Sequence, residues 1–309
     1  MTVRGIYKYH ITRPEKILTA LFVFVPPVAL ICAVIQAWGE GVDFFYLSLL
    51  GIFYMLTGLG ITVGFHRYFT HGSFKTSPLI ETILLVCGSA AVEKDVFKWC
   101  AAHRLHHQKS DVPGDPHSPH SFGSGGWAIC KGFVHAHVGW LFTILPKDIL
   151  KNVSDLYEKP RVRIIGKLFP LWVLLGLLIP AITGALYEHS WNGFFLGFLW
   201  GGLVRIALVH HVTWSTNSVC HIWGDRPFNT RKDRSTNNFF CAMFSMGEGW
   251  HNNHHKYPRS ARHGLQPGEF DLSWSLVHLC QKLGWVWDVK VPSQTEIQVA
   301  LSSKSSFRT

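Results

Sequence analysis

Clustered histidines are the residues in this sequence whose types and spacing most clearly indicate chemistry. The segments HRLHH and HNNHH share one spacing, in which a histidine is followed three and four positions later by two more. Positions i, i+3 and i+4 lie on one face of an α-helix, so each segment presents its imidazoles together. The histidines are His103, His106 and His107 in the first segment and His251, His254 and His255 in the second.

Two shorter elements add nitrogen and oxygen donors. HRYFTH contains His66 and His71 at the end of an apolar stretch, and NSVCH contains Asn217 and His221 just past another. Asn217 and His221 are one helical turn apart and share a face. His66 and His71 are out of α-helical phase, so we expect the helix to unwind there and turn both rings inward.

The adjacent histidine pairs predict two metal ions instead of one. Neighbouring side chains on a helix diverge by about 100°, so adjacent rings serve two neighbouring ions more easily than one. Imidazole suits Zn, Cu, Fe or Ni, and zinc usually takes only three or four protein ligands. Iron with an open position for oxygen chemistry therefore fits the histidine count better. The single Glu-x-x-His spacing, from Glu248 to His251, makes Glu248 at most a minor contributor.

The composition indicates that a bilayer is part of the solvent of this protein. Only 16% of the 309 residues are charged and 48% are hydrophobic, with 13 Trp and 22 Phe. The net charge of +10 fits basic loops that face anionic lipid, and no basic stripe indicates a nucleic-acid partner. The seven cysteines are scattered without a CxxC pair, which excludes a disulfide framework.

Four apolar segments are long enough to cross a membrane, and they predict an all-α integral membrane protein. The predicted transmembrane helices, at residues 17–38, 44–65, 164–187 and 194–212, form a stalk. Residues 66–163 and 213–292 form a cytoplasmic helical cap that holds the di-metal site, within a single domain of residues 1–292. Residues 79–92 are predicted to form a helix in the interface or cap. The polar tail, residues 293–309, is a candidate for disorder.

Loop charges predict the orientation of this multi-pass protein. The short connections GEGVD and EHSWN carry acids and no Lys or Arg, whereas the other segments outside the spans hold nearly all the basic residues. The positive-inside rule therefore places both termini and all the histidine clusters in the cytoplasm. We expect the bacterial plasma membrane, or the endoplasmic reticulum if the source is eukaryotic.

The histidine clusters and their flanking residues resemble the membrane fatty acyl-CoA desaturases of the stearoyl-CoA (Δ9) type. The motifs that carry the resemblance are GITVGFHRYFTH, HRLHHQKSDVPGDPHSP, HVGW, TWSTNSVCHIWGDRPF and GEGWHNNHHKYPRSARHG. The resemblance implies an oxidoreductase with a non-haem di-iron centre. Such an enzyme uses O₂ to remove two hydrogens from adjacent carbons of a saturated fatty acyl-CoA and leaves a cis double bond, with Δ9 as the family default.

The resemblance also implies a set of ligands and an electron donor. One iron would bind His66, His71, His103, His107 and His254. The other would bind His106, His221, His251 and His255, with Asn217 reaching it through a water. No cytochrome b5-like segment is visible, so we expect a separate donor of the ferredoxin, rubredoxin or cytochrome b5 type.

An inert acyl chain also requires a dry tunnel that sets which carbon meets the metals. Trp99, Trp140 and Trp214 are candidates for its wall, with Tyr54 and Gly51 at its closed end. Arg104 and Lys109 are candidates for binding the phosphates of a CoA head group.

Three other functions fit parts of the pattern. An acyl-lipid desaturase and a membrane hydroxylase of fatty acids or alkanes would use the same kind of metal centre. NSVCH and GDPHSP favour the desaturases over the hydroxylase. A metal transporter or sensor is the non-enzyme alternative, but its ligands should line a path through the bilayer, whereas these gather at one end.

Overall fold

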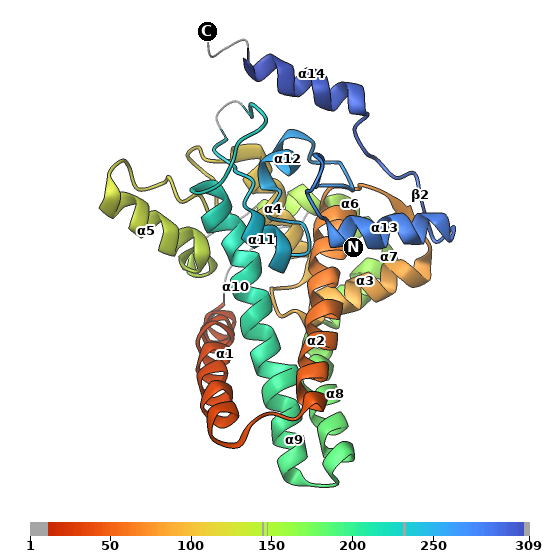
Figure 1. The fold of residues 1–309 in the computed structure, drawn as a ribbon. Coiled ribbons are helices and arrows are strands. Elements are labelled where there is room, and N and C mark those ends of the chain that lie inside the picture. Colours follow the sequence, from red (N-terminus) through yellow and green to blue (C-terminus); the bar gives the residue numbers. More distant parts are fainter. Residues whose placement is uncertain (1–11, 144, 147, 231–232, 306–309) are drawn as a thin grey trace.

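The computed structural model describes residues 12–143, 145–146, 148–230 and 233–305. It has a stalk of long helices and a cap of shorter helices and loops at one end of the stalk (Figure 1). Among the described residues, four helices are long and apolar enough to cross a membrane. The predicted fold class, an all-α integral membrane protein with a stalk and a helical cap, is confirmed.

The stalk consists of four membrane-crossing helices, two of which change their winding along their length. They are α1 (Arg13–Glu40); α2 (Phe44–Leu59) with the π-helix η2 (Gly60–Thr70); α8 (Phe169–Glu188); and α9 (Trp191–Gly197), the π-helix η5 (Phe198–Val204), α10 (Arg205–Ser218) and the 3₁₀ turn η6 (Val219–His221). Large apolar side chains on their outer faces are exposed, as lipid-facing helices require.

Two spans differ from their predicted bounds. The third was expected at 164–187, but α8 begins at Phe169 and a separate helix, α7 (Pro160–Lys167), precedes it. Pro170 explains this start. Proline has no N–H to donate, so it is tolerated in the first turn of a helix but interrupts a helix that would continue through it from the N-terminal side. The fourth was expected at 194–212, yet the helix continues to His221 because its polar end points into the cap.

Glycines allow α8 and α9 to pack closely at the stalk tip. A Cβ added at Gly184 would lie 2.1 Å from the carbonyl oxygen of Gly193, which no real side chain could tolerate. This backbone contact brings the last two spans into an antiparallel hairpin, so α10 rises beside α8 toward the cap (Figure 1).

The cap is built from short elements joined by long loops. Its remaining helices are α3 (Pro78–Ala90), α4 (Val96–Lys109), α5 (Gly126–His137), η3 (Gly139–Phe142), η4 (Ile149–Val153), α6 (Ser154–Glu158), α11 (Phe239–Phe244), α12 (His251–Lys256), α13 (Leu272–Lys282) and α14 (Gln294–Ser305). Strands β1 (Lys75–Thr76) and β2 (Val286–Trp287) pair antiparallel and join the two halves of the cap.

The apolar segment expected at 79–92 is helix α3, which extends sideways from the stalk (Figure 1). The Ser77 side chain caps it by accepting from the N–H of Ile80. Its one acid, Glu81, is buried but accepts a hydrogen bond from the Tyr68 hydroxyl at 2.6 Å. This bond explains how an apolar helix carries a carboxylate.

The C-terminal tail is more ordered than its polarity indicated. Residues 294–305 form helix α14 instead of a disordered segment. Ile297 and Ala300 are buried and pack in one cluster with Phe228 and Leu265 of the cap. Two apolar residues three positions apart were enough to dock the helix.

Candidate metal centre

His66 and His71 lie on and directly after the π-helix η2 at the top of the second span. The N–H of His71 donates to the carbonyl of His66 at 3.2 Å, the i to i+5 bond that defines a π-turn. The wider turn returns residue i+5 to the same face, and the two ring centroids are 4.9 Å apart. The sequence predicted unwinding here. The helix widens instead, which keeps its backbone hydrogen bonds while correcting the phase.

Helices α4 and α12 present the other two clusters as their spacing predicted. On α4, the Nε2 atoms of His103 and His107 are 3.1 Å apart, and on α12 those of His251 and His255 are 3.0 Å apart. Each i, i+4 pair therefore points its nitrogens at one place. The two helices lie beside each other, since Nε2 of His254 is 2.9 Å from Nε2 of His107.

The imidazoles form two groups, and within each the potential ligand atoms lie within 4.8 Å of one another. The groups are His66, His71, His103, His107 and His254, and His106, His221, His251 and His255. Adjacent histidines fall into different groups, as their divergence on a helix predicted. The groups are neighbours, because the rings of His107 and His255 stack with centroids 4.5 Å apart.

Within each group the Nε2 atoms face one another at hydrogen-bond distance. His66 and His254 are 3.1 Å apart in one group, and His221 and His251 are 3.1 Å apart in the other. Several converging nitrogens cannot all be paired by protons without charging the cluster. The donor set therefore fits a cation at the middle of each group.

Burial favours the neutral form, which a metal ligand needs, in three of these rings on α4 and α12. Burial, with the neighbouring imidazoles, lowers the pKa of His103, His107 and His254 well below the ordinary histidine value. A neutral imidazole keeps one nitrogen lone pair free. The buried surroundings therefore leave a lone pair on each of these three rings available to a metal ion.

Four imidazoles are held from behind by carboxylates. Nδ1 of His66 is 2.5 Å from Glu248, Nδ1 of His106 is 3.0 Å from Asp115, Nδ1 of His221 is 2.8 Å from Asp111, and Nδ1 of His255 contacts Asp233. A carboxylate at Nδ1 fixes the proton there and turns the Nε2 lone pair toward the centre. Three of the four acids serve the second group.

These acids are the functional residues that sequence reasoning missed. Asp111, Asp115 and Asp233 received no role, and Glu248 was considered only as a minor metal contributor. Glu248 instead orients His66. The buried Arg67 holds Glu248 in place by donating from Nη2 to Oε1 at 3.0 Å. A signal was available for Asp111 and Asp115, which follow HRLHH closely, because a buried histidine needs a partner for its second nitrogen.

A cavity of about 890 Å³ reaches the histidine cluster from the stalk. His66, His103 and His251 form part of its wall, and Asn217 of α10 lines it one turn before His221. The predicted tunnel residues Tyr54, Trp99, Trp140 and Trp214 all line it as well. The rest of the wall is mostly apolar and comes mainly from α1, α2, α4, α8 and α10 and from the loop between α3 and α4.

Three predicted tunnel and head-group residues lie elsewhere. Gly51 is exposed on the outer face of α2, one turn below Tyr54, and is not part of the cavity wall. Arg104 is held by Asp155 at 2.6 Å and by the carbonyls of Phe69 and Asn152, so its guanidinium is already satisfied. Lys109 is exposed at the end of α4, away from the cavity.

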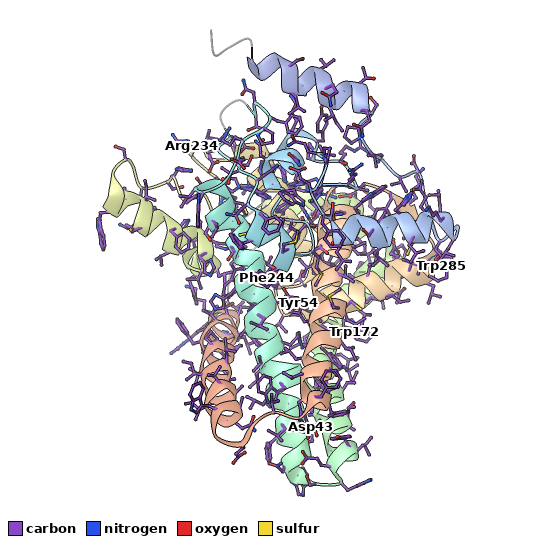
Figure 2. All side chains as sticks on the ribbon, viewed as in Figure 1. Asp43, Tyr54, Trp172, Arg234, Phe244 and Trp285 are labelled. Atoms are coloured by element: carbon purple, nitrogen blue, oxygen red, sulfur yellow. The ribbon has the colours of Figure 1, made fainter. Side chains whose placement is uncertain are left out.

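One part of the cavity wall lies where α2 meets the end of α11 and the residues that follow it. The Tyr54 hydroxyl donates to the carbonyl of Phe244 at 2.6 Å, and Figure 2 shows both residues where the stalk meets the cap. One turn further, a Cβ added at Gly58 would lie 2.5 Å from the Met246 Cε atom. All four residues line the cavity.

Comparisons with known proteins agree with this geometry. The family profile described as "Fatty acid desaturase" matches residues 42–274. A hex-5-enoyl-[acyl-carrier protein] acetylenase from Moorena producens (strain JHB) is 39% identical over 280 residues, covering 90% of this chain and 87% of the relative. An icosanoyl-CoA 5-desaturase from Limnanthes douglasii is 38% identical, covering 85% and 70%. An sn-1 stearoyl-lipid 9-desaturase from Anabaena variabilis is 38% identical, covering 79% and 84%.

The helical stalk, the clustered imidazoles and the adjoining cavity are the features of a membrane protein with a candidate metal site. The chain belongs to the fatty acid desaturase family.

Proposed function

We propose that this protein is an O₂-dependent di-iron desaturase that introduces a cis double bond, at Δ9, into a saturated fatty acyl-CoA. The observation that carries the proposal is that nine clustered imidazoles, in two groups, adjoin one mostly apolar cavity, with His66, His103 and His251 in its wall. A cavity of about 890 Å³ has the capacity for a long acyl chain.

The chain's own residues would hold two iron ions, one in each histidine group, with Asn217 reaching the second through a water. Iron, when bound, supplies the activation of O₂ that an unactivated C–H bond requires. The histidines donate lone pairs, and the carboxylates behind four of them hold the Nδ1 protons so that the rings keep their orientation.

The cavity residues would position the acyl chain and exclude water. Trp99 stacks on His103 with ring centroids 5.1 Å apart, so a methylene that passes this indole lies beside the histidine groups. Holding the reacting carbons at a fixed depth converts a flexible chain into a positioned reactant. Apolar walls keep competing water away from the oxidant.

The choice of a CoA thioester rests on charge at the outer part of the cavity. Where the wall reaches exposed residues it carries Arg163 and Lys167, which suit the phosphates of a carrier. The relatives named above act on acyl-carrier-protein, CoA and lipid substrates, so an acyl-lipid desaturase is the alternative.

The remaining partners follow from the same proposal. Electrons would come from a separate donor of the ferredoxin, rubredoxin or cytochrome b5 type. The protein would lie in the bacterial plasma membrane, or in the endoplasmic reticulum of a eukaryote, with both termini in the cytoplasm. Residues 1–11 and 306–309 lie outside the described part of the chain.

The fatty-ester profile of a host that lacks the activity tests the function. Expression together with an electron donor should raise the monounsaturated fraction, with the double bond located by gas chromatography and mass spectrometry of derivatised methyl esters. Hydroxy-acids in place of alkenes would move the assignment to a hydroxylase. An unchanged profile, despite folded protein and supplied donor, would count for a transporter or sensor instead.

A further inference from the structure

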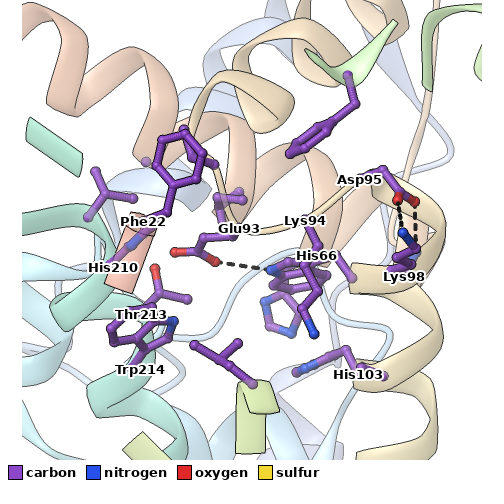
Figure 3. A pocket seen from close by; sticks show the side chains of 18 of the residues that line it. Phe22, His66, Glu93, Lys94, Asp95, Lys98, His103, His210, Thr213 and Trp214 are labelled. Carbon is purple, nitrogen blue, oxygen red and sulfur yellow. Dashed lines mark hydrogen bonds and ion pairs between the residues drawn. The ribbon is translucent and has the colours of Figure 1, made fainter. Parts of the chain in front are cut away.

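A carboxyl group extends into the acyl cavity from the loop that joins α3 and α4. Glu93 lines the cavity and is 9% exposed (Figure 3). Its Oε2 atom accepts a hydrogen bond from Trp99 Nε1 at 3.1 Å. Its other oxygen, Oε1, is buried with no hydrogen-bond partner among the described residues. Leaving a buried acceptor unpaired is costly, so this oxygen requires an explanation.

The backbone on both sides of Glu93 is strained. Val92 has φ 67° and Lys94 has φ 82°, both in the left-handed region that favours glycine. For a β-branched residue such as valine this conformation is a clear outlier. Strain of this kind persists only where the surrounding structure enforces it, and it concentrates at functional sites.

Two buried side chains of α10 enforce this loop conformation. Arg205 Nη1 donates to the carbonyl of Ala90 at 2.6 Å, and His210 Nε2 lies 3.0 Å from the carbonyl of Ala91. Arg205 also donates to Gly176 of α8 at 2.9 Å, which ties the loop to two stalk helices. The loop is therefore held at its start so that Glu93 faces the cavity.

The carboxyl lies one indole ring away from the histidine cluster. Trp99 separates the two, because its Nε1 bonds Glu93 while its ring stacks on His103. The nearby Lys94 does not neutralise Glu93, since its ammonium lies over the Trp140 ring, 5.2 Å from the centroid. Burial accordingly raises the pKa of Glu93 to about 7, against the hydrogen bond from Trp99.

We propose that Glu93 is a specificity-determining residue whose free oxygen accepts a hydrogen bond from a donor group on the substrate, close to the carbons that react. This inference rests on the proposed function, because it concerns the substrate of the same site. A plain methylene chain would leave Oε1 unpaired. A chain that carries an O–H or N–H at this depth satisfies it.

Two parts of a substrate carry such a donor. One is a hydroxyl group on the acyl chain itself. The other is the amide N–H of the carrier arm just beyond the thioester. It reaches Glu93 only if the reacting carbons are near the carboxyl end, so this source would replace the proposed Δ9 position, whereas a hydroxyl on the chain would not. The two sources share one chemistry and differ in where the donor is attached.

Binding to the purified full-length protein in lipid nanodiscs separates these sources. Quenching of tryptophan fluorescence would report affinity, because Trp99, Trp140 and Trp214 line the cavity. In one arm, N-acetylcysteamine thioesters, which keep the amide N–H, are compared with S-ethyl thioesters of the same acyl chains. In the other, S-ethyl thioesters of hydroxyacyl chains are compared with unsubstituted and oxo-substituted ones. The wild-type protein should bind the donor-bearing member of one arm about tenfold more tightly.

Glu93→Gln replaces the free acceptor oxygen in the cavity by a hydrogen-bond donor. The amide oxygen would take the Trp99 N–H, so the amide NH₂ would face the cavity as a donor. This variant should lose the tenfold preference and favour the oxo-acyl chain instead. Glu158→Gln makes the same chemical change at an exposed carboxylate outside the cavity wall and should leave the donor preference unchanged.

The arm in which the preference occurs identifies the source of the donor. Equal affinities in wild type for every donor-bearing and donor-free pair would overturn the proposal, even if Glu93→Gln failed to fold. The same holds if folded Glu93→Gln, judged by its thermal unfolding, kept the wild-type preferences. Because binding needs no turnover, a failure of the desaturase assignment would show separately in the fatty-ester profile.

Discussion

At the scale of single residues, the histidines are only half of the candidate metal site. The lone pair of a ring nitrogen points at a metal ion only if a partner holds the other nitrogen of the same ring. For His106 this partner is Asp115, which is itself buried. Removing such a partner leaves the ligand in place but lets the ring rotate and change its tautomer.

We expect Asp115→Asn to lower iron affinity and turnover roughly 10- to 100-fold, because the amide offers only a neutral partner to Nδ1. Iron per protein, measured by mass spectrometry after dialysis against a chelator, and product formation would check this. His107→Ala should lose iron outright. Asp148→Asn, at an exposed pair with Lys151, is the matched control and should behave as wild type. Wild-type iron retention in Asp115→Asn would contradict the role assigned to Asp115.

We propose that the wall around Gly58 and Met246 is the closed end of the cavity, and this gives a second prediction at this scale. A methyl group added in Gly58→Ala meets the tip of Met246 at 2.5 Å, so the flexible methionine must move into the space that a chain end would occupy. Product chain length should shorten by about two carbons, since pocket walls discriminate single methylenes. Gas chromatography of the products would measure the shift, and adding Met246→Ala should restore longer chains. An unchanged length distribution would place the closed end elsewhere.

At the scale of elements, helix phase organises the candidate site. An α-helical i, i+3, i+4 spacing is enough on α4 and α12, whereas η2 must become a π-helix to bring His66 and His71 together. The clusters and their helices were predictable because the signal lies within a few residues of chain. The pairing of Asp111 with His221 was not predictable, because the two residues meet across 110 positions of sequence and no local pattern encodes that contact.

The stalk hairpin gives a prediction at this scale. Gly184→Val places side-chain atoms into the carbonyl of Gly193, so α8 and α9 must separate. Unfolding free energy should fall by roughly 1–3 kcal/mol, seen as a lower thermal midpoint in detergent. Gly51→Ala adds a methyl to an exposed helical glycine with nothing within 4 Å and should leave the midpoint unchanged. Equal midpoints for both variants would show that the helices are not in contact there.

At the scale of the whole molecule, polar chemistry gathers at one end of an apolar stalk. Asp43 lies at the stalk tip remote from the cap, near the Tyr46–Glu188 hydrogen bond of 2.6 Å (Figure 2). The division into spans and cap followed from hydropathy alone. The shape of the cavity did not, because it depends on how α1, α2, α8 and α10 pack, and Gly51 and Tyr54 differ by less than one turn yet face lipid and cavity respectively.

Topology follows from the same polarity and is testable directly. In a bacterial host, green fluorescent protein fused at the C-terminus should fluoresce, because the cap is expected in the cytoplasm. Alkaline phosphatase fused at residues 189–190, in the stalk tip, should be active only in the periplasm. The opposite pattern in both fusions would reverse the orientation.

The interleaving of the two histidine groups has a consequence for how the centre is assembled. His106 and His107 are consecutive, as are His254 and His255, yet each pair is split between the groups. Neither half of the centre can therefore form without fixing the helices that build the other. The first ion to enter should order α4 and α12 for the second, so uptake of the pair should be cooperative, with little singly loaded protein at any iron concentration.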